Sequence, residues 1–462
     1  MSFFRTILMN LPEVEGPTQR KLSFKEKLKW TGIILVTFFV LGFIPLFGLG
    51  QNSLEQFEFL SVILGAEFGS IISLGIGPIV TASIVLQLLN GSGILKFDLR
   101  SEEGKKTFQG IQKLLSIFFI LFEAAIYVFM GGLAPDPALK GSLIFLDLEL
   151  IIIFQMFLGG VAILFMDEIV SKWGFGSGVS LFIAAGVSKT LFIRTFSPLP
   201  SPTNPEFATG AIPVLFQSLA SGASQMSLLM VAGIISTIIV FVIAVYSQAM
   251  KVEIPLSFGR IRGHGIRWPL SFIYTSNIPV ILVAALLANI QLWARLLETW
   301  LNWSGAQNIV AWVSVPGGNE GLLGAIIRQG SIFIGWKPYA QGLVYMIIMI
   351  IGAVIFSWFW VQTAGMDAKT QAKNIISSGL QVPGFRKDER VMERLLDRYI
   401  GPLTVMGAIT IGFLAAVADL SGSLVQGTSL LLTVMIVYRL YEDIAKQHMY
   451  DMHPMMRKFM EI

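Results

Sequence analysis

LGIGPIVTASIVLQLL, residues 74 to 89, is apolar enough to lie inside a membrane, yet Gly75, Gly77 and Pro78 stand at its beginning. Glycine weakens a helix because it has no Cβ, and proline interrupts one because it has no backbone N–H group. The stretch therefore predicts a membrane span that is broken where it begins. The rest of the sequence indicates what such a break is for.

Composition places the chain among helical membrane proteins. Of its 462 residues, 54% are hydrophobic and 13% are charged, whereas a soluble domain is about 25% charged. Apolar runs of about 20 residues, long enough to cross a bilayer as a helix, recur along the chain. We expect ten spans, near residues 31–49, 68–90, 109–131, 142–166, 177–194, 226–249, 270–292, 340–361, 400–419 and 423–444.

Basic residues give the expected orientation. If the chain begins on the inside, the loops and span ends on that side hold 27 of the 33 Lys and Arg residues. Cytoplasmic loops of membrane proteins carry such an excess. The sequence therefore predicts a multi-pass protein of the cell membrane with both termini in the cytoplasm.

A loop rich in proline and serine, FSPLPSPTNPEF (196–207), divides the chain into two halves of five spans. Before the first half, KLSFKEKLKW (21–30) is either an amphipathic helix at the membrane surface or a charged flank of the first span. We expect a cytoplasmic N-terminal segment over 1–29, a first half over 30–195, an external loop over 196–225 and a second half over 226–462.

The two halves share a feature in their second spans. SNIPVILVAALLANIQL (276–292) places Pro279 before an apolar run rich in small residues, as Pro78 stands in the first half. Because five is odd, the two spans run in opposite directions, and such a repeat is inverted. Paired interruptions in inverted halves point to a functional centre near the middle of the membrane. Each proline alone is also explained by the frequency of Pro and Gly in membrane helices.

No catalytic or metal-binding motif stands out. His264, His448 and His453 lie in polar cytoplasmic segments without the carboxylates of a metal helix, and cysteine is absent. We therefore expect neither an enzyme nor a metal or cofactor. The alternative from another class is a secondary transporter with an inverted repeat, in which Glu123 or Asp419 binds a proton. For Glu123 a hydrogen bond between helices is favoured, because no partner cation is evident in another span.

Aliphatic side chains follow the breaks. Ile76 and Val80 lie four residues apart, as do Val179 and Ile183 after the glycine-rich GFGSG, so each pair shares a helix face. A solute site would need polar groups at these positions, whereas aliphatic groups around a wide pore form a dewetted constriction. Ordinary helix packing explains any one of them. The candidate constriction is Ile76, Val80, Val179, Ile183, Ile281 and Leu432.

Taken in order along the chain, several segments resemble the SecY family, the channel subunits of the Sec protein translocon. Where bacterial members more typically have GIMP, this chain has GIGP, which resembles the archaeal and eukaryotic branch. The segments are WTGIILVTFFVLGFIPLFG (30–48), LGIGPIVTASIVLQLL (74–89), FQGIQKLL (108–115), DEIVSKWGFGSGVSLFIAAGVS (167–188), VEIPLSFGRIRG (252–263), YTSNIPVILVAALLANIQLW (274–293), PGFRK (383–387), RYIGPLTVMGA (398–408) and LLLTVMIVYRLYE (430–442).

The resemblance implies an all-α membrane protein whose ten spans form two inverted, pseudo-symmetric halves around a central pore, hinged between spans five and six. It implies that the six aliphatic residues seal this pore as a ring. It also implies a re-entrant plug helix, and EFLSVILGAEF is indeed too short to span and only moderately apolar. The plug falls on Glu58, Phe59, Leu60, Ser61, Val62, Ile63, Leu64, Gly65, Ala66, Glu67 and Phe68.

By the same resemblance, a lateral gate opens between spans two and three on one side and seven and eight on the other. Its polar contacts fall on Thr81, Gln112 and Asn289, which ordinary hydrogen bonding between helices also explains. Two basic cytoplasmic loops, 250–269 and 362–399, resemble those that dock the ribosome. Their docking residues are Arg260, Arg262, Arg267, Lys369, Lys373, Arg386 and Lys387.

The resemblance implies a protein-conducting channel that translocates secretory polypeptides and releases membrane-protein segments through the lateral gate. The implied partners are a SecE-type (gamma) subunit, a small beta subunit, the ribosome, signal sequences, nascent polypeptides and membrane lipid. The external loop at 293–339, where the resemblance fades, is assigned no role.

Overall fold

The structure is a computed structural model of the whole chain. It describes residues 11–18, 22–52, 67–91, 94–95, 97, 101–200, 207–258, 265–275, 278–301, 305–333, 335–377, 380–381 and 388–452.

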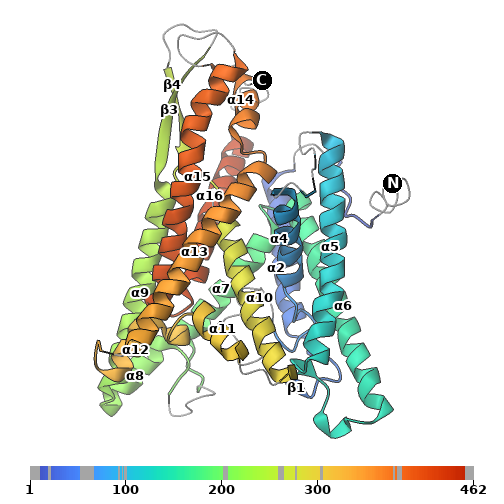
Figure 1. The fold of residues 1–462 in the computed structure, drawn as a ribbon, viewed down its shortest axis with the longest axis vertical. Coiled ribbons are helices and arrows are strands. Elements are labelled where there is room, and N and C mark those ends of the chain that lie inside the picture. Colours follow the sequence, from blue (N-terminus) through green and yellow to red (C-terminus); the bar gives the residue numbers. More distant parts are fainter. Residues whose placement is uncertain are drawn as a thin grey trace.

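Ten of the helices in these residues correspond one by one to the predicted spans (Figure 1). Six of the ten, α5, α6, α7, α9, α13 and α15, are long and apolar enough to cross a membrane, while α4 and α10 are apolar but shorter. The ten helices are α2 (Phe24–Gly42), α4 (Gly77–Gly91), α5 (Glu102–Phe129), α6 (Leu143–Trp173), α7 (Gly178–Phe196), α9 (Ser224–Ala249), α10 (Ile278–Leu301), α13 (Trp336–Thr363), α15 (Glu389–Leu420) and α16 (Gly427–Met452).

The two halves pack side by side. In Figure 1, α9, α13, α15 and α16 lie on one side of the molecule and α5 and α6 on the other, with α4 and α10 between them. Across this boundary α4 packs on α10 and α13, and α7 packs on α16. The largest buried apolar cluster draws residues from both halves, so the core of the bundle is their shared interface.

Shorter elements close the two ends of the bundle. The hairpin of β3 and β4 stands with α14 at one end, and α8, α11 and α12 lie toward the other (Figure 1). β3 pairs antiparallel with β4, with Ile254 opposite Trp268, and also with β5, while β1 pairs antiparallel with β2. These elements are α8 (Ala211–Ser221), α11 (Gly305–Val313), α12 (Gly321–Gln329), α14 (Ala368–Ser377), η1 (Pro137–Leu139), η2 (Gly318–Glu320), β1 (Gln51–Asn52), β2 (Leu133–Ala134), β3 (Lys251–Phe258), β4 (Gly265–Ser271) and β5 (Leu380–Gln381).

The seventh span begins later than predicted. We expected it from residue 270, but strand β4 continues to Ser271 and α10 begins only at Ile278. The strand accommodates Pro269 because β4 is an edge strand, where the missing N–H group of a proline need not cost a hydrogen bond of the sheet. Pro279 explains the helix start, since proline is favoured in the first turn, where its missing N–H group costs no hydrogen bond.

Helix α2 joins two segments that the sequence analysis treated separately, residues 21–30 and the first span from residue 31. Ser23 caps it by accepting from the Glu26 backbone N–H, and the Glu26 side chain accepts from the Ser23 N–H in return. From Phe24 the helix then runs without a break to Gly42. The described part of residues 21–30 is thus helical from Phe24 and continuous with the first span, and both interpretations of this segment stay predictions.

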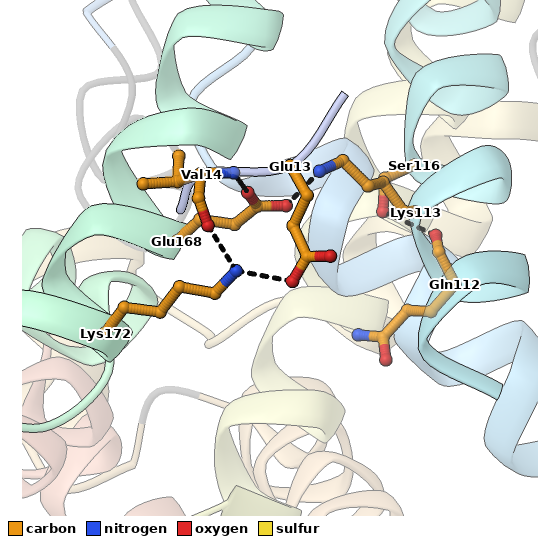
Figure 2. Close-up of polar contacts among 7 residues, drawn as sticks. All are labelled: Glu13, Val14, Gln112, Lys113, Ser116, Glu168 and Lys172. Atoms are coloured by element: carbon orange, nitrogen blue, oxygen red, sulfur yellow. Dashed lines mark hydrogen bonds and ion pairs between the residues drawn. The ribbon is translucent and has the colours of Figure 1, made fainter. Parts of the chain in front are cut away.

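The N-terminal segment at Glu13 and Val14 is tied to the C-terminal part of α6, which an ion pair connects to α5 (Figure 2). The Val14 N–H donates to Glu168 Oε2 at 3.0 Å, and the other oxygen of Glu168 pairs with Lys113 of α5. Lys172 pairs with Glu13 and donates to the Val14 carbonyl oxygen at 2.6 Å. Glu168 and Lys172 of α6 thus hold this segment in place, and Lys113 of α5 pairs with Glu168.

Acidification is expected to loosen this attachment. The hydrogen bond from Lys172 lowers the pKa of Glu13, so its contribution is present above the ordinary carboxyl pKa and is lost as the pH falls through the lowered value. A spin label on Glu15→Cys should gain mobility between pH 7 and about pH 3. Glu13→Gln should raise this mobility already at pH 7 and flatten the pH response. Equal profiles for the two proteins would contradict the assignment to Glu13.

Candidate constriction and gate

The break that opens α4 is built from turns. Residues 71–76 form successive turns in which the Gly75 N–H donates to the Ile72 carbonyl oxygen at 2.9 Å. Gly75 has φ +55°, a left-handed conformation that glycine adopts without a Cβ penalty. Pro78 is the second residue of α4, where it costs no hydrogen bond. The helix therefore starts at the break rather than bending there.

Pro279 has the same position in the opposite half. It is the second residue of α10, as Pro78 is of α4, and the two helices pack against each other. The Ile76 carbonyl oxygen accepts the first helical hydrogen bond of α4, from Val80 at 3.0 Å. Ile281 lies in the first turn of α10. The candidate constriction residues Ile76, Val80 and Ile281 thus lie within a few residues of the helix starts, Ile76 just before α4 and the other two in the first turns of α4 and α10.

The six candidate constriction residues share one apolar cluster. Five are buried, with exposed fractions from 1% at Ile76 to 7% at Ile281, and Val179 is partly buried and packs against the same cluster. They come from the break before α4, from α4 itself and from α7, α10 and α16. The structure thus places side chains from both halves in a common aliphatic core.

A chain of hydrogen bonds joins three helices beside this core. Asn289 of α10 donates to the Thr81 hydroxyl of α4 at 3.0 Å, and Thr81 lies 3.2 Å from Glu123 Oε1 of α5. Glu123 is fully buried, and its second oxygen has no hydrogen-bond partner among the described residues. The three side chains fasten α4 to α5 and α10 through a single hydroxyl group.

Gln112 lies outside this group. Its amide donates to the Ser83 hydroxyl at 2.7 Å and joins only α4 and α5. The structure therefore brings Thr81 and Asn289 together but puts Glu123 where Gln112 was expected. Both residues lie on the α5 face toward α4, because eleven residues make about three helical turns. The spacing of eleven residues from Gln112 is the sequence signal that could have identified Glu123. The sequence favoured a hydrogen bond between helices for the Glu123 carboxyl, and its contact with Thr81 fits that interpretation.

Most of the plug lies outside the described residues. Of its eleven positions, only Glu67 and Phe68 are described, and residues 58–66 are not. Glu67 forms an ion pair with Lys189 of α7, and Phe68 packs against the second buried cluster, which includes Leu46 and Leu74. The end of this segment is thus fastened to the first half.

The expected docking residues are only partly described. Arg260, Arg262, Arg386 and Lys387 lie outside the described residues. Arg267 is exposed on β4 and pairs with Glu253 of β3 at 2.9 Å. Lys369 and Lys373 are exposed on α14, at the same end of the bundle as the hairpin (Figure 1).

Comparison with known families decides the identity. The SecY family model matches residues 70–441, and the model of the plug domain of Sec61p matches residues 36–69. The chain belongs to the SecY family. Two relatives bear the name protein translocase subunit SecY: that of Methanothermobacter thermautotrophicus is 44% identical, over 99% of this chain and 98% of the relative, and that of Methanocaldococcus jannaschii is 43% identical, over 98% of both.

Solved SecY structures have the same fold. A structure described as that of a protein conducting channel has a TM-score of 0.81 at 42% identity, covering 97% of this chain and 98% of its own. Sec61 in the canine ribosome-channel complex from the endoplasmic reticulum has a TM-score of 0.78 at 40% identity, with the same coverage. The predicted fold of ten spans with a plug is therefore confirmed, and the SecY chain is a channel subunit rather than an enzyme or a transporter.

Removing the Thr81 hydroxyl tests the three-helix contact. Thr81→Val keeps the volume of the side chain but leaves Asn289 and Glu123 without their shared partner, at a cost of about 0.6–1.7 kcal/mol for each hydrogen bond lost between membrane helices. We expect Tm of the purified protein to fall. Ser83→Ala is the matched control, because it removes only the contact of Gln112, and its Tm should fall less. Equal losses would show that the Thr81 contacts contribute nothing specific.

Proposed function

We propose that this chain is the pore-forming subunit of a protein-conducting channel, which passes unfolded polypeptides across the membrane and releases apolar segments sideways. The observation that carries the proposal is the aliphatic core to which both halves contribute Ile76, Val80, Val179, Ile183, Ile281 and Leu432. The similarity to SecY and Sec61 channels over nearly the whole chain supports it.

The six side chains act as a seal. They offer no hydrogen-bonding group to water or ions, so a narrow passage between them is dewetted and blocks both. They also form no strong bond with a passing polypeptide, whose side chains differ at every position. A ring of this kind closes when the polypeptide has left and does not retain it.

The lateral gate runs along α4, where it packs on α10 and α13. Hydrogen bonds between membrane helices contribute only about 0.6 kcal/mol on average and about 1.7 at most. The link from Asn289 through Thr81 to Glu123 is thus strong enough to define the closed position and weak enough to break. Its breakage would open the boundary between the halves toward lipid.

The basic end of the molecule is the proposed ribosome-docking surface. Arg267, Lys369 and Lys373 are exposed there, and basic side chains bind RNA phosphates through charge pairing and counterion release. The canine relative was solved in a complex with the ribosome. This end faces the cytoplasm with both termini, and SecE-type and small beta subunits complete the channel.

Shortening the ring side chains tests the seal. Replacing Ile76, Val80, Val179 and Ile281 with glycine removes the aliphatic groups from the constriction, so reconstituted vesicles should leak ions and small solutes. Val240→Gly is a control for the single variant Val80→Gly, since it removes the same side chain from the same buried cluster outside the ring. Ion flux is measured after a potassium gradient is imposed. Flux equal to that of the parent would reject the seal.

Charge reversal tests the docking surface. The double variant Lys369→Glu, Lys373→Glu should bind ribosomes more weakly than the parent, and the affinity of the parent should fall steeply with salt. Lys337→Glu changes an exposed lysine at the start of α13, at the other end of the bundle, and should bind as the parent does. Co-sedimentation with ribosomes at several salt concentrations measures both effects. Equal binding of the parent and the double variant at low salt would contradict the assignment.

A further inference from the structure

An aspartate near the end of α6 holds the beginning of α7. The Val179 N–H donates to Asp167 Oδ1 at 2.9 Å. Gly178 makes the close approach possible, because a Cβ there would lie 2.5 Å from Asp167 Cα. The first turn of α7 is thus anchored on the helix before it.

The same arrangement recurs between α15 and α16. The Thr428 N–H donates to Asp419 Oδ1 at 2.7 Å. Asp419 Oδ2 accepts from the Thr428 hydroxyl and, at 2.6 Å, from the Tyr345 hydroxyl of α13. A Cβ on Gly427 would lie 2.1 Å from the Ala418 carbonyl carbon, so again only glycine fits.

The two contacts are equivalent in the inverted repeat. α6 and α7 are the fourth and fifth spans of the first half, as α15 and α16 are of the second. In both halves a glycine begins the fifth helix and the residue after it donates to the aspartate. The aspartate precedes that glycine by eleven residues in one half and by eight in the other. The contact is therefore common to the two halves although the connecting loops differ in length.

Each anchored helix carries a ring residue at the same distance. Ile183 is the fifth residue after Gly178, and Leu432 is the fifth after Gly427. Five residues correspond to about 7.5 Å along a helix, and a slip by one residue rotates a side chain by about 100°. A charge-assisted bond at the first turn thus controls both the depth and the direction of the ring side chain.

We propose that Asp167 and Asp419 are positioning residues of the pore seal, one in each half, which hold α7 and α16 in the register that points Ile183 and Leu432 into the constriction. This inference rests on the sealing function proposed above. Because the halves run in opposite directions, one aspartate acts at each end of the bundle.

Alanine and asparagine variants test the inference. Asp167→Ala and Asp419→Ala should raise ion leak through reconstituted channels about tenfold or more, since loss of a hydrogen bond to a charged group shifts an equilibrium by at least that factor. Asp167→Asn and Asp419→Asn keep an acceptor oxygen for the helix amide and should restore low leak. Asp136→Ala removes a comparable cap, that of η1, and should not leak. Leak equal to that of the parent in folded alanine variants, or no rescue by asparagine, would overturn the proposal.

A labelling experiment separates positioning from general loosening. The chain has no native cysteine, so Ile183→Cys or Leu432→Cys provides a single thiol for a membrane-impermeant maleimide. Asp167→Ala should accelerate labelling more at Ile183→Cys, and Asp419→Ala more at Leu432→Cys. Equal acceleration at both sites would contradict the inference.

Two further comparisons complete the test. If an alanine variant does not fold, Asp167→Glu or Asp419→Glu replaces it in both assays, because the extra methylene displaces the helix start while the charge remains. Ile183→Gly and Leu432→Gly test the seal itself. Leak in these two with none in the aspartate variants would reject the positioning role and leave the seal intact, whereas no leak in any variant would reject the seal.

Discussion

Every backbone amide inside a bilayer needs a hydrogen-bond partner, and this constraint determines how the second membrane span can be interrupted before α4. Membranes tolerate an interrupted helix only where protein or a water-filled cavity supplies the missing partners. Here the turns before α4 bond one another, the Ser73 hydroxyl accepts from the Gly69 N–H at 2.9 Å, and Pro78 has no N–H to satisfy. The backbone groups named above therefore have their hydrogen bonds although the interruption is buried, and aliphatic side chains beside it pack in the core.

Two kinds of contact are found near this interruption, one between aliphatic side chains and one between polar side chains. The candidate constriction is aliphatic, and an aliphatic passage excludes water without binding what passes. Along α4 there are also polar contacts, and at one of them the Thr81 hydroxyl is shared by Asn289 of α10 and Glu123 of α5. A purely apolar boundary would gain little over contact with lipid, because lipid tails are as apolar as leucine. In the proposed channel, the polar link through Thr81 would give the closed state a defined position.

Sequence patterns predicted the helices better than the elements between them. The hairpin was missed, although Val252, Ile254 and Leu256 alternate with less apolar residues as a strand requires. Buried Ile254 and Leu270 pack in a cluster with α14 and α15, a context that no local window contains. Gln112 was expected beside Thr81 for a similar reason: one face of α5 presents two polar groups, and only packing selects Glu123.

The sequence by itself determined the number of spans, their inverted halves, the family and the breaks at Pro78 and Pro279. The spans and the breaks follow from transfer free energies and backbone geometry, which act within about 20 residues. The inverted halves follow from comparing distant spans, and the family from the resemblance of segments along the whole chain. Only the tertiary structure decided which side chains meet: Glu123 with Thr81, Asp167 with α7, and Asp419 with α16. Such contacts depend on the rotation and depth of whole helices, which are set by packing between remote parts of the chain.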